Sequence, residues 1–192
     1  MSETEMVKLC QNGDRDAFNT LVEKYQNQVV NIAYSMLSDR EDAYDAAQEV
    51  FVKIYRSIGG FKGKSSLSTW IYRIVSNVCN DTLRKRQRQA NIISINTARG
   101  DEDEQHEIEL EDSSPTPEER IELSEQQGLV RDALAELNDK YREIITLFDI
   151  EQLRYEEIAE ILKCPVGTVK SRLNRARAEL KKKLLKNKEH FS

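Results

Sequence analysis

Apolar residues between Phe18 and Leu37 recur every three or four positions, and this spacing constrains the fold more than any other feature. Residues at that spacing share one face of an α-helix, so the segment predicts a long amphipathic helix. Gly13 and Asp14 offer a break and an N-cap before it. The 192 residues include only 7 Gly and 3 Pro, which favours helices over strands. We therefore predict an all-α fold.

The same reasoning predicts two further helices in the first half of the chain. Ser38 or Asp39 caps the second helix, and Gly59-Gly60 ends it. Its inward residues are Ala43, Ala47, Val50, Phe51 and Ile54. Ser68 caps the third helix, whose apolar stripe is Trp70, Ile71, Ile74, Val75, Val78 and Leu83. Three such helices suffice for a compact core, in which we expect Trp70.

Residues 155–180 predict two helices joined by a short turn. Residues 155–162 form a short amphipathic helix, and Pro165 disfavours helical backbone at Cys164. The second helix carries apolar residues at steps of three and four, with polar and basic residues on its other faces. A basic amphipathic helix alone is also typical of a solvated surface. The preceding helix and proline turn favour a DNA-binding helix-turn-helix instead.

Charge is segregated along the chain, although the net charge is only -5. Residues 100–125 hold twelve acids and one base, whereas residues 163–188 hold ten bases and one acid. A polyanion responds to the local basic segment, so the acidic total does not exclude a nucleic-acid partner. The acidic run and Ser113-Ser114-Pro115-Thr116-Pro117 predict a flexible linker. This run is either a solubilising tether or a mimic of a nucleic-acid backbone.

These features predict two helical domains, residues 1–90 and 118–192, joined by an acidic linker at 91–117. No apolar run is long enough for a membrane span, and the N-terminus lacks the pattern of a secretory signal. Three cysteines without a Cys-x-x-Cys pair are typical of reduced thiols in the cytoplasm. No pattern indicates a metal, a cofactor or catalysis, so we do not expect an enzyme.

Two blocks together resemble a known family. Residues 42–55 (DAYDAAQEVFVKIY), Phe61-Lys62-Gly63 and residues 68–77 (STWIYRIVSN) resemble region 2 of the extracytoplasmic-function (ECF) sigma factors of bacterial RNA polymerase. Residues 155–178, with CPVGTVKSR at 164–172, resemble region 4 of that family. The family usually has Ser or Thr where this chain has Arg154, so the usual N-cap of the first region 4 helix is missing.

The resemblance implies a partner for each part of the chain. One helix docks on a coiled coil of the largest subunit of core polymerase, and region 4 meets the flap. The docking residues that match are Asp42, Asp45, Gln48, Glu49 and Phe51. Promoter DNA is the second partner, and an anti-sigma factor is a further partner that the family implies.

The resemblance also assigns residues to the two promoter elements. Residues matching the capture of an unstacked base of the minus-10 element are Ser57, Phe61, Lys62 and Asn77, with backbone charge from Arg73, Arg84, Lys85 and Arg86. Residues matching the minus-35 base readers are Lys170, Ser171, Asn174 and Arg175, with Thr168 and Arg172 as phosphate contacts. The 27 linker residues reach roughly 90 Å when extended. Two turns of DNA span about 70 Å, so both elements are within reach.

The resemblance therefore implies a sigma factor that binds core polymerase, reads both elements and aids melting. The alternative is a stand-alone helix-turn-helix regulator that binds DNA without polymerase.

Overall fold

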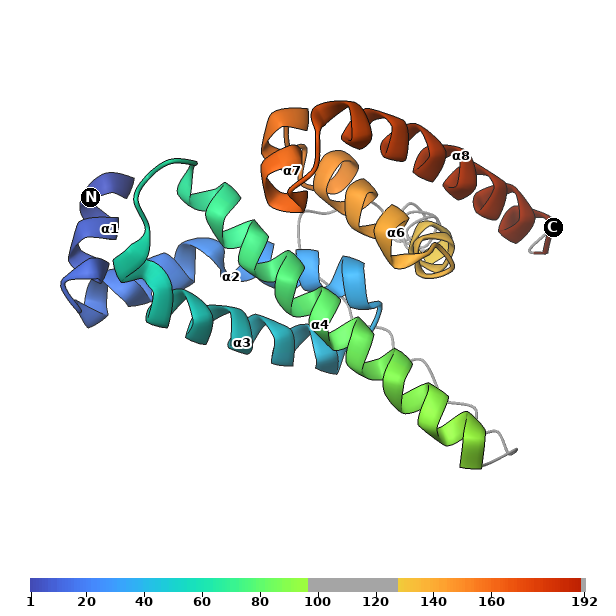
Figure 1. The fold of residues 1–192 in the computed structure, drawn as a ribbon, viewed down its shortest axis with the longest axis horizontal. Helices are drawn as coiled ribbons and strands as arrows, with labels where there is room; N and C mark the ends of the chain where they lie inside the picture. The colour runs from blue at the N-terminus through green and yellow to red at the C-terminus, as the bar shows by residue number, and fades with distance from the viewer. Residues whose placement is uncertain (97–127, 191–192) are drawn as a thin grey trace, which may run out of the picture.

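The computed structural model describes residues 1–96 and 128–190, and every regular element within these ranges is helical (Figure 1). The predicted all-α fold is confirmed. The N-terminal module (residues 1–96) comprises α1 (Glu3–Gln11), α2 (Arg15–Leu37), α3 (Arg40–Ser57), a 3-10 turn (Ile58–Gly60) and α4 (Leu67–Asn96). The C-terminal module (residues 128–190) comprises a helical segment at 128–135, α6 (Asp139–Ile145), a π-helical turn η2 (Thr146–Ile150), α7 (Tyr155–Leu162) and α8 (Val166–His190).

The predicted linker at 91–117 falls almost entirely outside the described residues. Its first six residues continue α4, which runs to Asn96. Helix therefore extends beyond the boundary predicted at residue 90. The acidic run at 100–125 lies outside the described ranges, so its predicted role stays a prediction.

Two of the predicted N-caps in the N-terminal module are present. The Asp14 carboxylate accepts a hydrogen bond of 2.9 Å from the Ala17 N–H, and Asp39 accepts one of 2.8 Å from the Asp42 N–H. These bonds satisfy donors that have no partner within the helix. Trp70 is buried in the core as predicted.

The predicted N-cap at Ser68 is wrong. α4 begins at Leu67, and the Ser66 hydroxyl accepts a hydrogen bond of 3.1 Å from the Thr69 N–H. An N-cap side chain reaches a backbone N–H two or three residues further on, so Ser68 stands inside the first turn. The prediction also missed α1, although Ser2 and Glu5 form a reciprocal capping box at its start.

The predicted helix-turn-helix is confirmed in the C-terminal module. α7 ends at Leu162, and Lys163, the C-cap, takes the left-handed conformation with a positive φ of 51°. Val169, Leu173 and Ala176 of α8 are fully buried along one stripe. At the start of α7, the Glu157 carboxylate accepts hydrogen bonds from the Arg154 N–H (3.0 Å) and Nε (3.2 Å), which lower the pKa of Glu157. Glu157 therefore satisfies the Arg154 N–H, but the bond that a Ser or Thr side chain would accept at this N-cap is not made by Arg154.

The two modules pack against each other and share one apolar core. α4 contacts α6 and α7, and α2 contacts α6 and η2, whereas the C-terminal end of α4 projects beyond the other helices (Figure 1). Buried polar contacts join the modules as well. The Arg142 guanidinium donates a bond of 2.7 Å to the Met36 carbonyl, and Ser76 and Asn80 both donate to the Glu143 carboxylate.

Within the described ranges, no helix is both long and apolar enough to cross a membrane.

Candidate nucleic-acid interface

The predicted minus-35 readers lie on the exposed side of α8. Lys170, Ser171, Asn174 and Arg175 are exposed, opposite the buried Val169, Leu173 and Ala176 stripe. The Ser171 hydroxyl donates a hydrogen bond of 3.1 Å to the Thr168 carbonyl, and the Thr168 side chain is half-buried. α8 thus presents two cations and an amide from one helix face, which are the groups that read base edges in a major groove.

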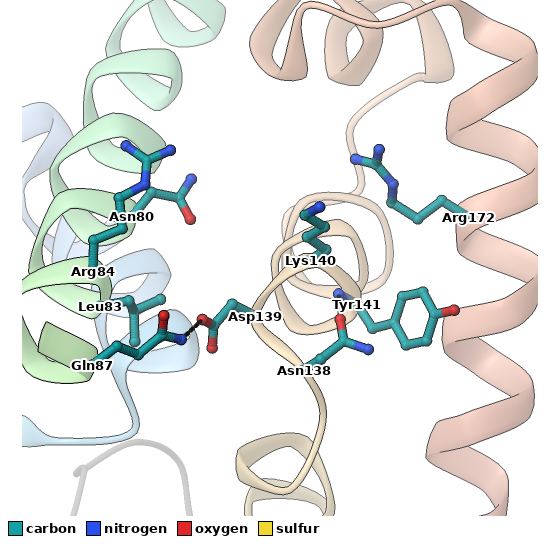
Figure 2. Close-up of a pocket in the computed structure, with 9 residues that line it drawn as sticks. All are labelled: Asn80, Leu83, Arg84, Gln87, Asn138, Asp139, Lys140, Tyr141 and Arg172. Atoms are coloured by element: carbon teal, nitrogen blue, oxygen red, sulfur yellow. Dashed lines mark hydrogen bonds between the residues drawn. The ribbon is translucent and has the colours of Figure 1, made fainter. Parts of the chain in front are cut away.

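Arg172 lies differently, because it is half-buried and lines a cleft of about 490 Å³ between the modules. Figure 2 shows Asn80 and Arg84 of α4 on one side, facing Lys140 and Arg172 on the other. At the same cleft Gln87 donates a hydrogen bond of 3.1 Å to Asp139. The structure therefore brings together Arg84 and Arg172, which the sequence had assigned to two separate promoter elements.

A second cavity, of about 380 Å³, lies on the N-terminal module between α3 and α4. Its lining includes Ser57 and Asn77, both predicted as minus-10 residues, and Ile74 of α4. Lys53 and Arg56 also line it, and the sequence prediction missed both. The available signal was the position of Lys53, which lies four residues before Ser57 and three before Arg56, because residues three and four apart share a helix face.

Phe61 and Lys62 lie outside the lining of this cavity. The Phe61 ring packs against Trp70, with centroids 5.2 Å apart, and is half-buried. The Gln11 side chain donates to the carbonyls of Ile58 (3.1 Å) and Phe61 (2.9 Å), which ties this turn to α1. Lys62 is exposed on the loop that follows.

Two residues predicted for different partners instead bind each other. The guanidinium of Arg86, predicted to contact DNA, forms an ion pair with Asp42, predicted to bind polymerase. Arg86 also donates a bond of 3.0 Å to the Leu37 carbonyl. These contacts fasten α4 to the end of α2 and the start of α3. The other predicted cations on α4 differ in exposure: Arg73 is half-buried, Lys85 is exposed, and Arg84 pairs with Asp81 at 3.1 Å on the surface.

The predicted polymerase-docking residues Asp45, Gln48 and Glu49 are exposed on α3. Glu49 pairs with Lys53 at 2.8 Å, and this hydrogen bond lowers the pKa of Glu49. Phe51, a further predicted docking residue, is half-buried against the core, as predicted from its inward position on the helix.

Three exposed apolar residues on α3 were missed by the prediction. Tyr44, Val52 and Tyr55 are 46%, 47% and 52% exposed. Tyr55 also meets Phe18 edge to face, with ring centroids 5.0 Å apart. All three lie outside the stripe of buried residues on α3. Helical periodicity could therefore have identified them as exposed apolar residues.

Among the described residues, no group of three or more His, Cys, Asp or Glu side chains is arranged to hold a metal ion.

Two family models match the chain. Sigma-70 region 2 matches residues 21–89, and Sigma-70, region 4 matches residues 127–180. The chain is 39% identical to the ECF RNA polymerase sigma-E factor of Haemophilus influenzae over 96% of each chain. It is 36% identical to the RNA polymerase sigma-H factor of Pseudomonas aeruginosa, over 95% of this chain and 93% of that one. It is 34% identical to the ECF RNA polymerase sigma factor SigW of Bacillus subtilis, over 93% and 94%.

Two solved structures are similar in fold. One is the sigma factor RpoE in complex with the anti-sigma factor NepR from Bartonella quintana, with a TM-score of 0.65 and 25% identity over 88% of this chain and 96% of that one. The other is CnrH in complex with the cytosolic domain of CnrY, with a TM-score of 0.64 and 24% identity over 92% of each chain.

Proposed function

This chain belongs to the extracytoplasmic-function group of the sigma-70 family, and we propose that it binds core RNA polymerase and directs it to specific promoters. One arrangement carries the proposal. A single chain combines an exposed cationic recognition helix with a separate cavity lined by hydrogen-bonding side chains. The helix suits the major groove of duplex DNA, and the cavity suits a base that has left the stack. Such a factor acts in the cytoplasm, with polymerase and DNA.

At the minus-35 element, α8 enters the major groove. Arg175 and Lys170 suit guanine O6 and N7, and Asn174 suits adenine N6 and N7. Ser171 completes the set of base readers, while Thr168 and Arg172 contact phosphates. Arg175→Ala is expected to cost about 1 to 3 kcal/mol on the preferred sequence and to flatten the preference at one base pair. Arg172→Ala weakens every sequence alike and makes the salt dependence shallower.

At the minus-10 element, the cavity beside Asn77 receives an extruded base. Opening the duplex costs a few kcal/mol per base, and apolar contact with Ile74 and hydrogen bonds in the cavity offset part of that cost. Ser57 and Asn77 offer polar groups, while Lys53 and Arg56 offer charge for the backbone. Asn77→Ala is expected to reduce open-complex formation, read by permanganate reactivity of unpaired thymines, more than closed-complex binding. Asn19→Ala, at an exposed position of α2, is the matched control. Equal loss in both assays refutes this role.

Polymerase docking uses the exposed face of α3. Asp45, Gln48 and Glu49 supply acidic and amide groups, and Tyr44, Val52 and Tyr55 supply exposed apolar contact beside the half-buried Phe51. Asp45→Arg with Gln48→Ala is expected to weaken core binding without changing the helical fold, because both side chains are exposed. Glu23→Arg, the same charge reversal at an exposed position of α2, is the control. Unchanged core affinity of the α3 variant refutes this assignment.

Promoter binding requires the modules to separate. Asn77 adjoins Ser76, which bonds to Glu143 of the C-terminal module, and Arg172 faces α4 across the cleft. The surfaces proposed for the minus-10 and minus-35 elements therefore belong to modules that are packed together, whereas two turns of DNA span about 70 Å. The compact arrangement is thus a state that precedes promoter binding. An anti-sigma partner, as in the RpoE complex with NepR, is proposed for this state.

The experiment that tests the function is transcription from candidate promoters with purified core polymerase, with and without this chain. Promoter-specific transcripts are expected only when both are present. A stand-alone regulator would instead bind DNA without polymerase and leave the promoter choice of core unchanged.

A further inference from the structure

Four side chains form a continuous stack on the C-terminal module. The Arg177 guanidinium lies 5.0 Å from the Phe148 ring centroid, and the Phe148 and Tyr155 rings stack 4.9 Å apart at an angle of 13°. The Lys170 ammonium lies 5.4 Å from the Tyr155 ring centroid. Two aromatic rings therefore stand between two cations. We call these four residues the cation–aromatic stack.

Three separate elements build this stack. Lys170 and Arg177 are seven residues apart on α8, so they lie on one face about two turns apart. Tyr155 is the first residue of α7, and Phe148 belongs to the π-helical turn Thr146–Ile150. A π turn changes the direction in which side chains leave a helix, and such turns are frequent at functional sites.

One end of the stack is fixed by a charge-assisted contact. Asp149, beside Phe148, accepts a hydrogen bond of 3.1 Å from Arg177 Nε and pairs with a second nitrogen of the same guanidinium. Such two-point contacts define geometry more strongly than a single bond. Phe148 and Tyr155 are also half-buried against the core. Lys170 lies at the other end of the stack and is exposed. It contacts the Tyr155 ring, whose position is fixed by Phe148 and by packing against the core.

We infer that Tyr155 is a positioning residue that holds the Lys170 ammonium for one base pair of the minus-35 element. The inference rests on the proposed function, in which Lys170 reads a base edge. A lysine side chain has many rotamers, and binding DNA must restrict them. The negative face of an aromatic ring attracts an ammonium group and restricts these rotamers in advance. Pre-organisation of this kind lowers the entropic penalty of binding.

The stack thereby connects the first helix of the helix-turn-helix to base reading by the second. Tyr155 needs no contact with a base for this role. The face of the Tyr155 ring restricts the Lys170 ammonium, so Tyr155→Phe is expected to keep this restriction. Tyr155→Leu keeps an apolar side chain of intermediate size but removes the ring, and the restriction is lost. Loss of an exposed cation–ring contact corresponds to a reduction of about twofold to fivefold in preference at the affected base pair.

The experiment is a binding titration of holoenzyme, core polymerase with this chain, over a library of minus-35 sequences. Lys170→Ala first identifies the base pair that Lys170 reads, as the position where preference flattens. Tyr155→Leu is expected to flatten the same position and no other, whereas Tyr155→Phe keeps the wild-type preference. A Tyr155→Leu variant that keeps the preference at that position, or weakens all sequences uniformly, overturns the inference. So does a Tyr155→Phe variant that loses the preference.

A second measurement uses the unmodified chain and avoids any folding defect of the variants. Side-chain NMR of the free chain is expected to show the ε-methylene protons of Lys170 shifted upfield by the Tyr155 ring current, relative to those of exposed Lys62. Unshifted Lys170 signals overturn the inference. Failure of the proposed function has a different signature: wild-type holoenzyme shows no minus-35 preference at all, although the upfield shift is present.

Discussion

The side-chain amide of Asn80, in α4, donates a hydrogen bond of 2.9 Å to a carboxylate oxygen of Glu143, in α6. Ser76, one turn earlier on α4, donates to the same oxygen. Glu143 is only 5% exposed, and burial raises the pKa of its carboxyl, although both hydrogen bonds and the charge of Arg172 oppose this change. The modules are therefore joined at a buried acid whose charged form is incompletely compensated.

The stability of the folded chain is expected to depend on pH through Glu143. A folded-state pKa above the unfolded value means that the folded chain binds the proton more tightly. The contribution of Glu143 to stability is thus greatest below about pH 4.5, its ordinary pKa, and is lost as the pH rises through the raised folded value. A tenfold difference in proton affinity corresponds to about 1.4 kcal/mol.

Glu143→Gln tests this dependence, because glutamine keeps an acceptor oxygen for Ser76 and Asn80 without the charge. Urea unfolding is measured across this pH window. As the pH rises, the variant is expected to gain stability relative to wild type. Above the raised folded-state pKa of Glu143, the difference between the two unfolding free energies is expected to stay constant. Glu160→Gln, on the exposed face of α7, is the control and is expected to show no such gain. Parallel curves for Glu143→Gln and wild type would contradict the role of Glu143.

Replacing Arg142 is expected to destabilise both the C-terminal module and its contact with α2. The buried guanidinium donates to four backbone carbonyls, those of Met36 (2.7 Å), Leu134 (3.0 Å), Ala135 (2.6 Å) and Leu137 (2.9 Å). Arg142→Met keeps much of the apolar stem and leaves these acceptors without their donor. A loss of about 3 kcal/mol in the free energy of unfolding is expected. Arg88→Met, at an exposed position, is expected to change it by less than about 0.5 kcal/mol.

Local signals made much of the fold predictable. The N-caps at Asp14 and Asp39 and the stripe of Val169, Leu173 and Ala176 depend on residues within one or two turns of one another. The wrong prediction of Ser68 as an N-cap is also local, because Ser66 and Ser68 are two residues apart and either could cap the same helix. Such errors shift an element boundary and leave the topology unchanged.

Contacts distant in the chain could not be predicted in the same way. Arg86 and Asp42 are both charged and suited to external partners by type, yet they are 44 residues apart and pair with each other. Arg142 and Glu143 are adjacent in sequence, and both are buried where the modules meet. Helical periodicity assigns polar side chains to the solvent side and carries no information about a second module that covers them.

The start of α4 offers a test with two serines two residues apart. Ser66→Ala removes the acceptor of the Thr69 N–H, and a loss of about 1 kcal/mol in unfolding free energy is expected. Ser68→Ala replaces a residue within the first turn by a better helix former, so little or no loss is expected. Thermal or urea unfolding of both variants measures the difference. Equal losses, or a larger loss for Ser68→Ala, would contradict Ser66 as the N-cap and favour Ser68.

The three cysteines are expected to differ in reactivity toward an aromatic disulfide reagent. Cys79 is fully buried in α4, and burial raises the pKa of its thiol to about 12, while Cys10 is also buried and its pKa is raised. Cys164 is partly exposed in the turn between α7 and α8. Since the thiolate is the reacting species, one fast equivalent is expected in the native chain and three after unfolding. Cys164→Ser is expected to abolish the fast reaction, and its persistence in that variant would show that Cys10 or Cys79 is accessible in the folded chain.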